Sequence, residues 1–370
     1  MIGANKTYRI MISGGGTGGH IYPAISIAQA LKDSTAEVDI LFVGAKGKME
    51  MQKVPEAGFE IVGLWISGIQ RRLTLQNLLF PLKLVVSLLR SFQLLRTFKP
   101  DVVIGVGGYA SGPLLLAAII KKIPTLIQEQ NAYAGLTNKW LARSVNTICV
   151  AYEGMEKFFP IEKIVITGNP VRKNIQMELG KKESAYRFFE LDPTKKTILI
   201  IGGSLGARTI NESILSGINQ LMEADVQVIW QTGAYYHQEV LARVKEQLDH
   251  RLKIFNFISE MQEAYLVSDI VISRAGALSI AELMLTGKPS ILVPSPNVAE
   301  DHQTLNAKTL VNKGAAILVA DLAAHEDLVK TALSLVSDKV KQEALSKNIL
   351  SMGHPEAARD IAKEIRALVA

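Results

Sequence analysis

Residues 273–282 combine the residue types and the spacing of a nucleotide-binding site. A short apolar strand, Ile270–Ser273, ends at Arg-Ala-Gly, and an amphipathic helix follows it. Gly276 permits a tight turn, so the first-turn N–H groups of this helix, which have no partner inside it, face outward as an anion site. Glu282 lies beyond that turn, where its carboxylate can accept hydrogen bonds from the hydroxyls of a ribose. An ordinary β–α–β unit with a solvated Glu282 explains the stretch equally well.

A glycine-rich loop near the N-terminus offers a second anion site. The strand Tyr8–Ser13 runs into Gly14-Gly-Gly-Thr-Gly-Gly-His20, and a helix is predicted from about Pro23 to Leu31. The loop satisfies the dinucleotide pattern G-x-G-x-x-G, but the second strand, Val38–Val43, ends without the acidic residue that binds a ribose in dinucleotide folds. The loop therefore favours a diphosphate bound by backbone N–H groups over a dinucleotide oxidoreductase.

Polar side chains gather at the predicted strand ends of the first half. His20 is a candidate general base, because histidine titrates near neutral pH, although it can equally cap the helix or pack against Tyr22. Tyr109, Glu129 and Asn131 follow two later strands. Ligands of a parallel sheet bind beyond the carboxyl ends of its strands, where all of these residues fall. Hydrogen bonding within a loop explains Glu129 and Asn131 at least as well.

The elements that would position these residues alternate between strands and helices along the whole chain. Each predicted strand ends in a glycine or polar loop, which indicates an α/β fold with parallel sheets. The segment Ile198–Arg208 can be laid over Ile10–His20 without a gap, and glycines of the two loops then coincide. Because 370 residues exceed one ordinary core, we expect two similar Rossmann-like domains facing each other across a cleft that binds phosphorylated ligands.

Composition narrows the class of protein without choosing its ligand. The net charge of +6 and the pI of about 9.1 favour an anionic partner, such as a nucleotide or a membrane surface. No helix-turn-helix or aromatic-basic pattern points to nucleic acid. Cys149 is the single cysteine, which excludes an internal disulfide and a cysteine-rich metal site. No apolar signal region follows Lys6 and Arg9, so we expect no secretion signal.

Residues 71–99 combine many apolar side chains with interspersed cations. No uncharged run in this segment reaches the ~18 residues that a transmembrane helix needs, and Pro81 starts or breaks a helix within it. A pair of core helices explains much of the segment. An apolar helix face flanked by cations can also lie on an anionic bilayer. We expect a segment that is mostly core, with an exposed edge that touches a membrane.

Six motifs occur together and in order along nearly the whole chain. They are Gly14-Gly-Gly-Thr-Gly-Gly-His-Ile-Tyr-Pro23, Gly107-Gly-Tyr-Ala-Ser-Gly112, Glu129-Gln-Asn131, Gly168-Asn-Pro-Val-Arg172, Gly202-Gly-Ser-Leu-Gly-Ala-Arg208 and Ser273-Arg-Ala-Gly-Ala-Leu-Ser-Ile-Ala-Glu282. With these motifs the chain resembles the MurG family of bacterial N-acetylglucosaminyltransferases, which convert lipid I to lipid II in peptidoglycan synthesis. The resemblance implies the GT-B architecture. It places an N-terminal acceptor-binding and membrane-associating domain at 1–168, completed by a helix at about 353–370, and a C-terminal domain for the UDP-sugar donor at 169–352.

The same resemblance implies an inverting hexosyltransferase. Such an enzyme moves N-acetylglucosamine from UDP-N-acetylglucosamine to the 4-hydroxyl of the N-acetylmuramoyl sugar of lipid I, an undecaprenyl-linked acceptor. It needs no cofactor, and the chain has no Asp-x-Asp pair that would suggest a metal. A UDP-N-acetylglucosamine epimerase on the same plan is the alternative, and a binding module without turnover is a third reading. The implied location is peripheral, on an anionic membrane surface at the cytoplasmic face of the plasma membrane, with cell-wall synthesis proteins as candidate partners.

The site residues of the family carry over onto the matching positions of this chain. For UDP-N-acetylglucosamine the positions are Thr17, Gly18, Gly19, Asn131, Arg172, Ser204, Ile258, Ala277, Leu278, Ser279, Ile280, Ala281, Glu282 and Gln303. For the acceptor diphosphate they are Gly14, Gly15, Gly16 and Tyr109. Within the first set, Arg172 and Ser204 would contact the donor diphosphate and Glu282 the ribose. His20 is the expected base, with Glu129 as its rival.

Overall fold

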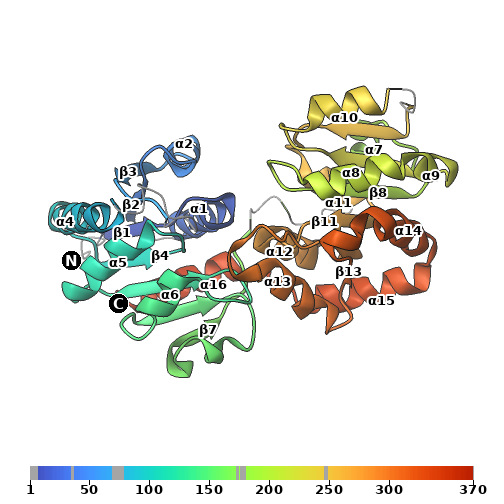
Figure 1. Ribbon diagram of the computed structural model, residues 1–370. Coiled ribbons are helices and arrows are strands. Elements are labelled where there is room, and N and C mark those ends of the chain that lie inside the picture. Colours follow the sequence, from blue (N-terminus) through green and yellow to red (C-terminus); the bar gives the residue numbers. More distant parts are fainter. Residues whose placement is uncertain are drawn as a thin grey trace. The chain divides into compact units, whose positions relative to one another are not determined.

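The computed structural model describes residues 7–34, 37–68, 79–171, 175, 181–245 and 249–369. The chain divides into two compact units, each with its own hydrophobic core (Figure 1). Unit 1 consists of Met1–Arg172 together with Glu356–Ala370, and unit 2 consists of Lys173–Pro355. The C-terminal segment therefore returns to the unit that contains the N-terminus.

Unit 1 is built on a seven-stranded sheet in which every neighbouring pair is parallel. Its strands are β1 (Tyr8–Ser13), β2 (Val38–Ala45), β3 (Glu60–Leu64), β4 (Val102–Gly105), β5 (Thr125–Glu129), β6 (Thr147–Val150) and β7 (Ile164–Ile166). The strand order is β3-β2-β1-β4-β5-β6-β7. The central strands are runs of Ile, Val and Leu that are buried on both faces, as expected when helices cover both sides of a parallel sheet.

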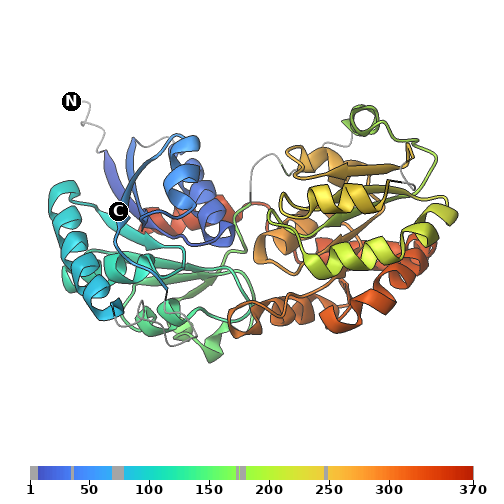
Figure 2. The ribbon, with the colours of Figure 1, turned by 45° about the horizontal axis from the view of Figure 1, so that its top comes forward.

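The helices of unit 1 form two layers, one on each face of this sheet. They are α1 (Gly18–Lys32), α2 (Glu50–Glu56), α4 (Phe80–Phe98), α5 (Ser111–Ile120), α6 (Leu136–Leu141) and α16 (Ala357–Ala367), with short 3₁₀ turns at η1 (Met155–Lys157) and η2 (Ile161–Lys163). α1 and α16 share one core cluster, whereas α4, α5 and α6 share the other. Figure 2 shows α16, in red, among the elements of the N-terminal half, and it packs directly on α1.

Unit 2 repeats this plan with a six-stranded parallel sheet. Its strands are β8 (Thr197–Ile201), β9 (Gln227–Gln231), β10 (Leu252–Phe255), β11 (Ile270–Ser273), β12 (Ser290–Leu292) and β13 (Ile317–Leu318), in the order β10-β9-β8-β11-β12-β13. Its helices are α7 (Lys182–Phe189), α8 (Arg208–Ser216), α9 (Ile218–Glu223), α10 (His237–Arg243), α11 (Met261–Val267), α12 (Ala277–Thr286), α13 (His302–Val311), α14 (Ala324–Ser337) and α15 (Lys339–Leu350), with 3₁₀ turns at η5 (Ala299–Asp301) and η6 (Asp321–Ala323). The predicted fold class, two Rossmann-like parallel-sheet domains, is confirmed.

Both sheets reverse their strand order at the first strand of the unit. In unit 1 this switch lies between β1 and β4, and in unit 2 between β8 and β11. In doubly wound folds the connections leave the sheet in opposite directions at such a switch point. Ligands of these folds bind there, beyond the carboxyl ends of the two strands. The two predicted glycine loops and the Arg274–Gly276 turn all start at these switch points.

The first helix begins earlier than the sequence pattern predicted. The expected start was Pro23, a residue type that favours the first turn of a helix. In the structure α1 already starts at Gly18, because the N–H groups of His20 and Ile21 both donate to the carbonyl oxygen of Thr17 and close the first turn. His20 consequently belongs to a helix N-terminus rather than to a free loop.

Candidate active site

The glycine loop after β1 packs against the loop after β4. A Cβ atom on Gly108 would overlap the carbonyl oxygen of Gly15, and one on Gly16 would lie 3.3 Å from Cε1 of Tyr109. The N–H of Val106 also donates to the carbonyl oxygen of Ser13 at 2.7 Å. The structure therefore brings together the four positions predicted for the acceptor diphosphate, Gly14, Gly15, Gly16 and Tyr109, at the switch point of unit 1.

A buried carboxylate that the sequence analysis missed lies beneath this loop. Oε2 of Glu50 accepts the N–H of Gly16 at 3.0 Å, and Oε1 accepts the N–H of Ala45 at 2.9 Å. Glu50 is fully buried. Since the N–H of Gly16 is directed at Glu50, that group does not point toward a bound diphosphate. The signal that could have revealed Glu50 is its place at the start of α2, shortly after β2 ends at Ala45.

The first turn of α1 supplies the outward-facing donors of unit 1. Thr17 is the N-cap residue and has an extended backbone, and the helix continues through Gly18 and Gly19. N–H groups in the first turn of a helix have no acceptor within the helix, and the helix dipole adds a partial positive charge there. The three positions predicted near the donor sugar and phosphates therefore lie together at the start of α1.

His20 lies in the first turn of α1 and contacts a glutamine that the sequence analysis passed over. Its Nδ1 is 3.0 Å from Oε1 of Gln130, a buried residue directly after β5. Gly107 packs closely against the imidazole ring, because a Cβ on this glycine would lie 2.8 Å from both Nδ1 and Cε1 of the ring. The imidazole is thus held at the switch point between β1 and β4.

Glu129, the predicted rival base, is buried and serves as an acceptor for its own loop. Its Oε1 accepts the N–H of Asn131 at 3.1 Å. Its Oε2 accepts the N–H of Gly135 at 2.9 Å and Nδ2 of Asn138 at 2.8 Å. The carboxylate therefore fixes the loop that carries Asn131 onto the N-terminus of α6. This geometry gives Glu129 the loop-bracing role that the sequence analysis considered as its alternative.

In unit 2 the loop Gly202–Ala207 follows β8 and exposes Ser204. Gln231, at the end of β9, connects this loop to the next one. Its Nε2 donates to the carbonyl oxygen of Gly203 at 3.1 Å, and its Oε1 accepts the N–H of Ile258 at 2.8 Å. One buried side chain thereby links Gly203, the neighbour of Ser204, to Ile258, whose N–H is directed at Gln231.

Glu282 is buried in the middle of α12, so the solvated alternative considered above is wrong. Its Oε2 accepts the hydroxyl of Tyr265 at 3.0 Å, which holds the carboxylate in place. Leu278 and Ser279 are only partly buried and lie in the first turn of the helix. The side chains of Ala277, Ile280 and Ala281 are buried and pack the helix onto the unit.

Gln303 and Arg274 form hydrogen bonds to the loop that follows β12 in unit 2. Oε1 of Gln303 accepts the N–H of Ser295 at 2.9 Å, which ties the start of α13 to the loop after β12. Arg274 donates to the carbonyl oxygens of Val293 and Pro294 at 3.1 and 3.2 Å and pairs with Asp321. The remaining predicted donor residue, Arg172, lies outside the described residues.

The electrostatics of unit 1 keep Tyr109 protonated. Burial raises the pKa of its hydroxyl, and the nearby Glu50 carboxylate raises this pKa further. A phenol that keeps its proton can donate a hydrogen bond to an anion. Across the described part of the chain, no group of His, Cys, Asp and Glu side chains is arranged to hold a metal ion. Within the same residues, no helix has both the length and the apolar character required to cross a bilayer.

Comparison with known protein families covers most of both units. The N-terminal domain model of glycosyltransferase family 28 matches residues 10–150, and the C-terminal domain model of the same family matches residues 197–365. These spans contain most of β1 and all of β2 to β6 in unit 1, and β8 to β13 in unit 2. Both switch points lie inside the matched regions.

Comparison with individual proteins extends the match to nearly the full length. The chain is 55% identical to the UDP-N-acetylglucosamine–N-acetylmuramyl-(pentapeptide) pyrophosphoryl-undecaprenol N-acetylglucosamine transferase of Cytophaga hutchinsonii, over 98% of each chain. It is similar to the crystal structure of MurG from Acinetobacter baumannii, with a TM-score of 0.78, 27% identity and coverage of 97% and 99%. A UDP-N-acetylglucosamine 2-epimerase from Neisseria meningitidis shares the fold at a TM-score of 0.66 and 17% identity, with coverage of 97% and 100%.

Proposed function

Because this chain belongs to the UDP-N-acetylglucosamine–N-acetylmuramyl-(pentapeptide) pyrophosphoryl-undecaprenol N-acetylglucosamine transferases of glycosyltransferase family 28, we propose that it glycosylates lipid I. It moves N-acetylglucosamine from UDP-N-acetylglucosamine to the 4-hydroxyl of the N-acetylmuramoyl sugar, with inversion, and the product is lipid II. The observation that carries this conclusion is the 55% identity over nearly the full length, which includes the loops at both switch points. The resemblance inferred from the six motifs is thereby confirmed.

The geometry of unit 2 supports a site for the uridine diphosphate part of the donor. The buried Glu282 carboxylate, oriented by Tyr265, is the acceptor for the ribose hydroxyls. The uracil is recognised through the carbonyl oxygen of Ile258, since the N–H of this residue is directed at Gln231. Leu278 and Ser279 contact the nucleoside at the start of α12, and the buried Ala277, Ile280 and Ala281 shape that surface from behind.

The phosphates and sugars are assigned to the remaining predicted positions. Ser204 and Arg172 contact the donor diphosphate, and Gln303, Asn131 and the Thr17–Gly19 turn contact the N-acetylglucosamine. For the lipid I diphosphate, the site is the paired loops Gly14–Gly16 and Gly107–Tyr109. The hydroxyl of Tyr109, whose pKa is raised, is the protonated donor for this anion.

The chemical step is a single in-line displacement. The 4-oxygen of the acceptor forms a bond to the anomeric carbon while the bond from that carbon to the phosphate oxygen of UDP breaks. His20 takes the proton of the 4-hydroxyl, because its ring stands at the switch point beside the glycine loop. Helix N-terminal N–H groups and the Arg172 guanidinium stabilise the negative charge of the departing UDP. Glu129 positions the Asn131 loop and does not take the proton.

UDP release in the presence and absence of a lipid I analogue tests this function. We expect release that depends on the acceptor, together with glycosylation of the acceptor. In Glu282→Ala, loss of a hydrogen-bonded charged acceptor raises the KM for UDP-N-acetylglucosamine about 10- to 100-fold. The exposed Glu223, also in unit 2, is the matched control, and Glu223→Ala keeps the wild-type KM. Acceptor-independent turnover of the donor would instead identify an epimerase.

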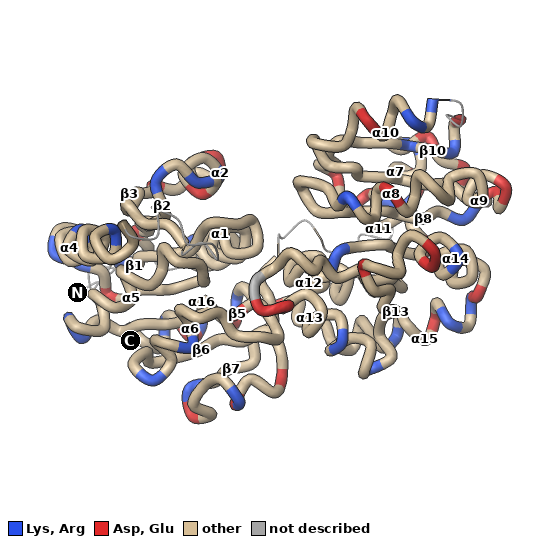
Figure 3. Tube along the Cα trace, in the orientation of Figure 1, with Lys and Arg blue, Asp and Glu red and all other residues tan. Residues whose placement is uncertain are grey.

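We also infer that α4 attaches the enzyme to an anionic membrane surface at the cytoplasmic face. Leu82, Val85 and Leu89 lie on one face of this helix and are 52%, 54% and 64% exposed. Blue segments along α4 in Figure 3 mark the cations that accompany this apolar stripe. Apolar side chains with flanking cations combine insertion into the bilayer with attraction to its charge. The preceding residues of the predicted segment, 71–78, lie outside the described residues.

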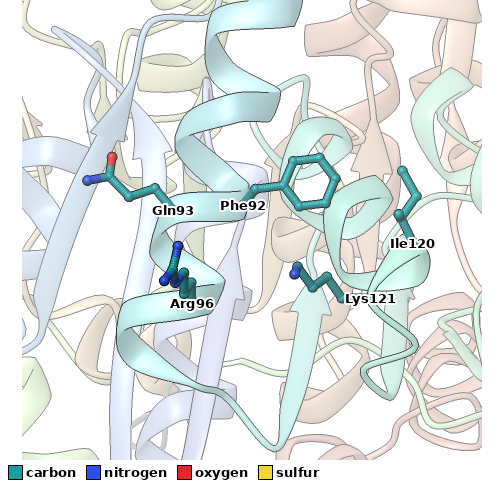
Figure 4. Close-up of a pocket in the computed structure, with 5 residues that line it drawn as sticks. All are labelled: Phe92, Gln93, Arg96, Ile120 and Lys121. Carbon is teal, nitrogen blue, oxygen red and sulfur yellow. The ribbon is translucent and has the colours of Figure 1, made fainter.

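A pocket of about 470 Å³ between α4 and the end of α5 supports the same inference. Figure 4 shows the side chains that line it, Phe92, Gln93, Arg96, Ile120 and Lys121. An aromatic ring and an exposed isoleucine next to two cations suit the boundary between acyl chains and lipid phosphates. Leu136 and Trp140 of α6, a helix that shares a core cluster with α4, are exposed as well.

Flotation with lipid vesicles tests the membrane contact. We expect binding to vesicles that contain anionic lipid and weaker binding to neutral ones. The double variant Leu82→Ser/Leu89→Ser should lose at least about tenfold in binding, because two half-exposed leucines no longer insert. Leu322→Ser is the control, since Leu322 is 98% exposed in unit 2. Equal binding of the double variant and the control would contradict the role of α4.

A further inference from the structure

A buried chain of side-chain amides runs from His20 across the carboxyl ends of the sheet in unit 1. Gln130 contacts the imidazole, with its Oε1 3.0 Å from Nδ1. Gln128, on β5, bonds to Gln130 on one side and to Asn169 on the other. All three amides are buried. Buried amides of this kind must satisfy their donors and acceptors within the protein, so their orientations are mutually constrained.

The direction of each hydrogen bond follows from the main-chain carbonyls at both ends. Nδ2 of Asn169 donates to the carbonyl oxygen of Gln130 at 2.9 Å, so Oδ1 of Asn169 accepts from Nε2 of Gln128 at 3.0 Å. Gln128 therefore presents its Oε1 to Nε2 of Gln130. Nε2 of Gln130 also donates to the carbonyl oxygens of Val106 and Gln128, at 2.7 and 3.2 Å.

A carbonyl oxygen can only accept a hydrogen bond, so the NH₂ end of Gln130 must face these carbonyls. The atom that faces His20 is then the amide oxygen, which also only accepts. Nδ1 of His20 consequently donates and carries the ring proton. In the neutral imidazole this leaves the basic lone pair on Nε2.

We propose that Gln130 is a positioning residue that holds His20 in the Nδ1–H tautomer, so that Nε2 accepts the proton of the acceptor hydroxyl. This inference rests on the proposed function, because it concerns the base of that reaction. The opposite tautomer would present an N–H to the incoming hydroxyl, where the reaction requires an acceptor. When Nε2 takes the proton, Nδ1 keeps its own, so the hydrogen bond to Gln130 is made both before and after the transfer.

Packing keeps the ring against Gln130. Gly107 has a φ of +95°, and a Cβ there would lie 2.8 Å from Nδ1 and 3.4 Å from Oε1 of Gln130. The contact between the imidazole and the amide is therefore possible only beside a residue without a side chain. A neutral amide also orients the ring without placing a second charge next to the imidazolium that forms during the reaction.

Nitrogen NMR of the full-length, ¹⁵N-histidine-labelled enzyme reads the tautomer directly. The His20 signals are those absent from His20→Asn, and the other histidines of the six in the chain serve as internal controls. At a pH where the ring is neutral, we expect a protonated, pyrrole-type Nδ1 and an unprotonated, pyridine-type Nε2. The reverse pattern in the wild-type protein would overturn the proposal without any variant.

Two substitutions of Gln130 connect the tautomer to catalysis. Gln130→Met removes the acceptor for Nδ1, and we expect the Nδ1–H signature to be lost and kcat to fall by about 100-fold, with the KM for the donor within about twofold. Gln130→Glu keeps an oxygen toward Nδ1, so the Nδ1–H signature should remain and kcat should stay above that of Gln130→Met. Its second oxygen replaces the NH₂ group that faces the carbonyl oxygens of Val106 and Gln128, so we expect a lower Tm for this variant. Its negative charge favours the imidazolium, which moves the acidic limb of the kcat profile to higher pH.

A purely structural role for Gln130 predicts equal losses in both variants and an unmoved pH profile, which would overturn the proposal. The NMR reading separates this inference from the proposed function. A protein that shows the Nδ1–H form of His20 but does not glycosylate lipid I would disprove the function and leave the tautomer assignment intact. A working transferase whose His20 carries its proton on Nε2 would disprove the positioning role alone.

Discussion

At the scale of single residues, the side chains of the site are of two kinds. Some are proposed to contact the ligands, and others hold loops or other side chains in place by hydrogen bonds. His20 and Glu282 could be nominated as site residues from the sequence, because each lies in a local motif, and their roles stay predictions. Glu50 and Gln130 could not, since Glu50 bonds to a loop 34 residues away and Gln130 to a ring 110 residues away. Only the fold makes these pairs neighbours. Glu129 was nominated as a rival base by its motif, and in the structure its carboxylate accepts hydrogen bonds from its own loop.

The space beside the His20 ring can be tested with one methyl group. Gly107→Ala introduces a Cβ 2.8 Å from Nδ1, so the ring must shift and kcat should fall at least about tenfold. Gly154 is the matched control, because it also has a positive φ, of +77°, but a Cβ there meets nothing within 4 Å. Both alanines carry a similar backbone cost of about 1 kcal/mol. Measuring kcat and Tm for the two variants separates the steric effect on the His20 ring from the backbone cost that both variants share. An equal kcat in both would contradict the steric account.

At the scale of elements, the strands were predictable from the sequence, whereas their order in the sheets and the start of α1 were not. Runs of Ile, Val and Leu between glycine loops identified the central strands of both sheets. The start of α1 was misplaced because the Thr17 carbonyl, rather than Pro23, closes the first turn.

The connection from α12 to β12 contains Lys288, whose ammonium group lies against the main chain. Nζ of Lys288 donates to the carbonyl oxygen of Ser268 at 2.6 Å, inside unit 2.

Lys288 should make the stability of unit 2 depend on pH. Burial lowers the pKa of this ammonium from 10.5 to about 8, repulsion from Lys182 adds to the decrease, and Asp269 opposes it. Between about pH 8 and 10.5 the unfolded chain binds the proton and the folded unit does not, so the unfolding free energy rises with pH there. The rise is up to about 3 kcal/mol. Urea unfolding of wild type and Lys288→Met from pH 7.5 to 10 measures it, and parallel curves for the two proteins would contradict it.

At the scale of the whole molecule, the internal repeat was sufficient to predict two parallel-sheet halves. Each unit also contains a buried residue that can report when the unit unfolds. Cys149, the single cysteine, lies in the core of unit 1, where burial raises the pKa of its thiol. Trp230 lies on β9 in the core of unit 2 and is fully buried, with its indole N–H bonded to Asn211. Thiol labelling and tryptophan fluorescence therefore follow the unfolding of different units.

The fluorescence of Trp230 and the labelling of Cys149 can show which unit binds the nucleotide. Apart from Arg172, the residues assigned to the uridine diphosphate lie in unit 2, so UDP should stabilise that unit. At 100 times its Kd, a ligand adds about 2.7 kcal/mol to the unfolding free energy of the part that binds it. In a Trp65→Phe/Trp140→Phe background, we expect UDP to shift the urea midpoint of Trp230 fluorescence more than that of Cys149 labelling. Adding Glu282→Ala should reduce this difference at the same UDP concentration, because the ribose loses its acceptor. Equal shifts of both probes would contradict the placement of the nucleotide in unit 2.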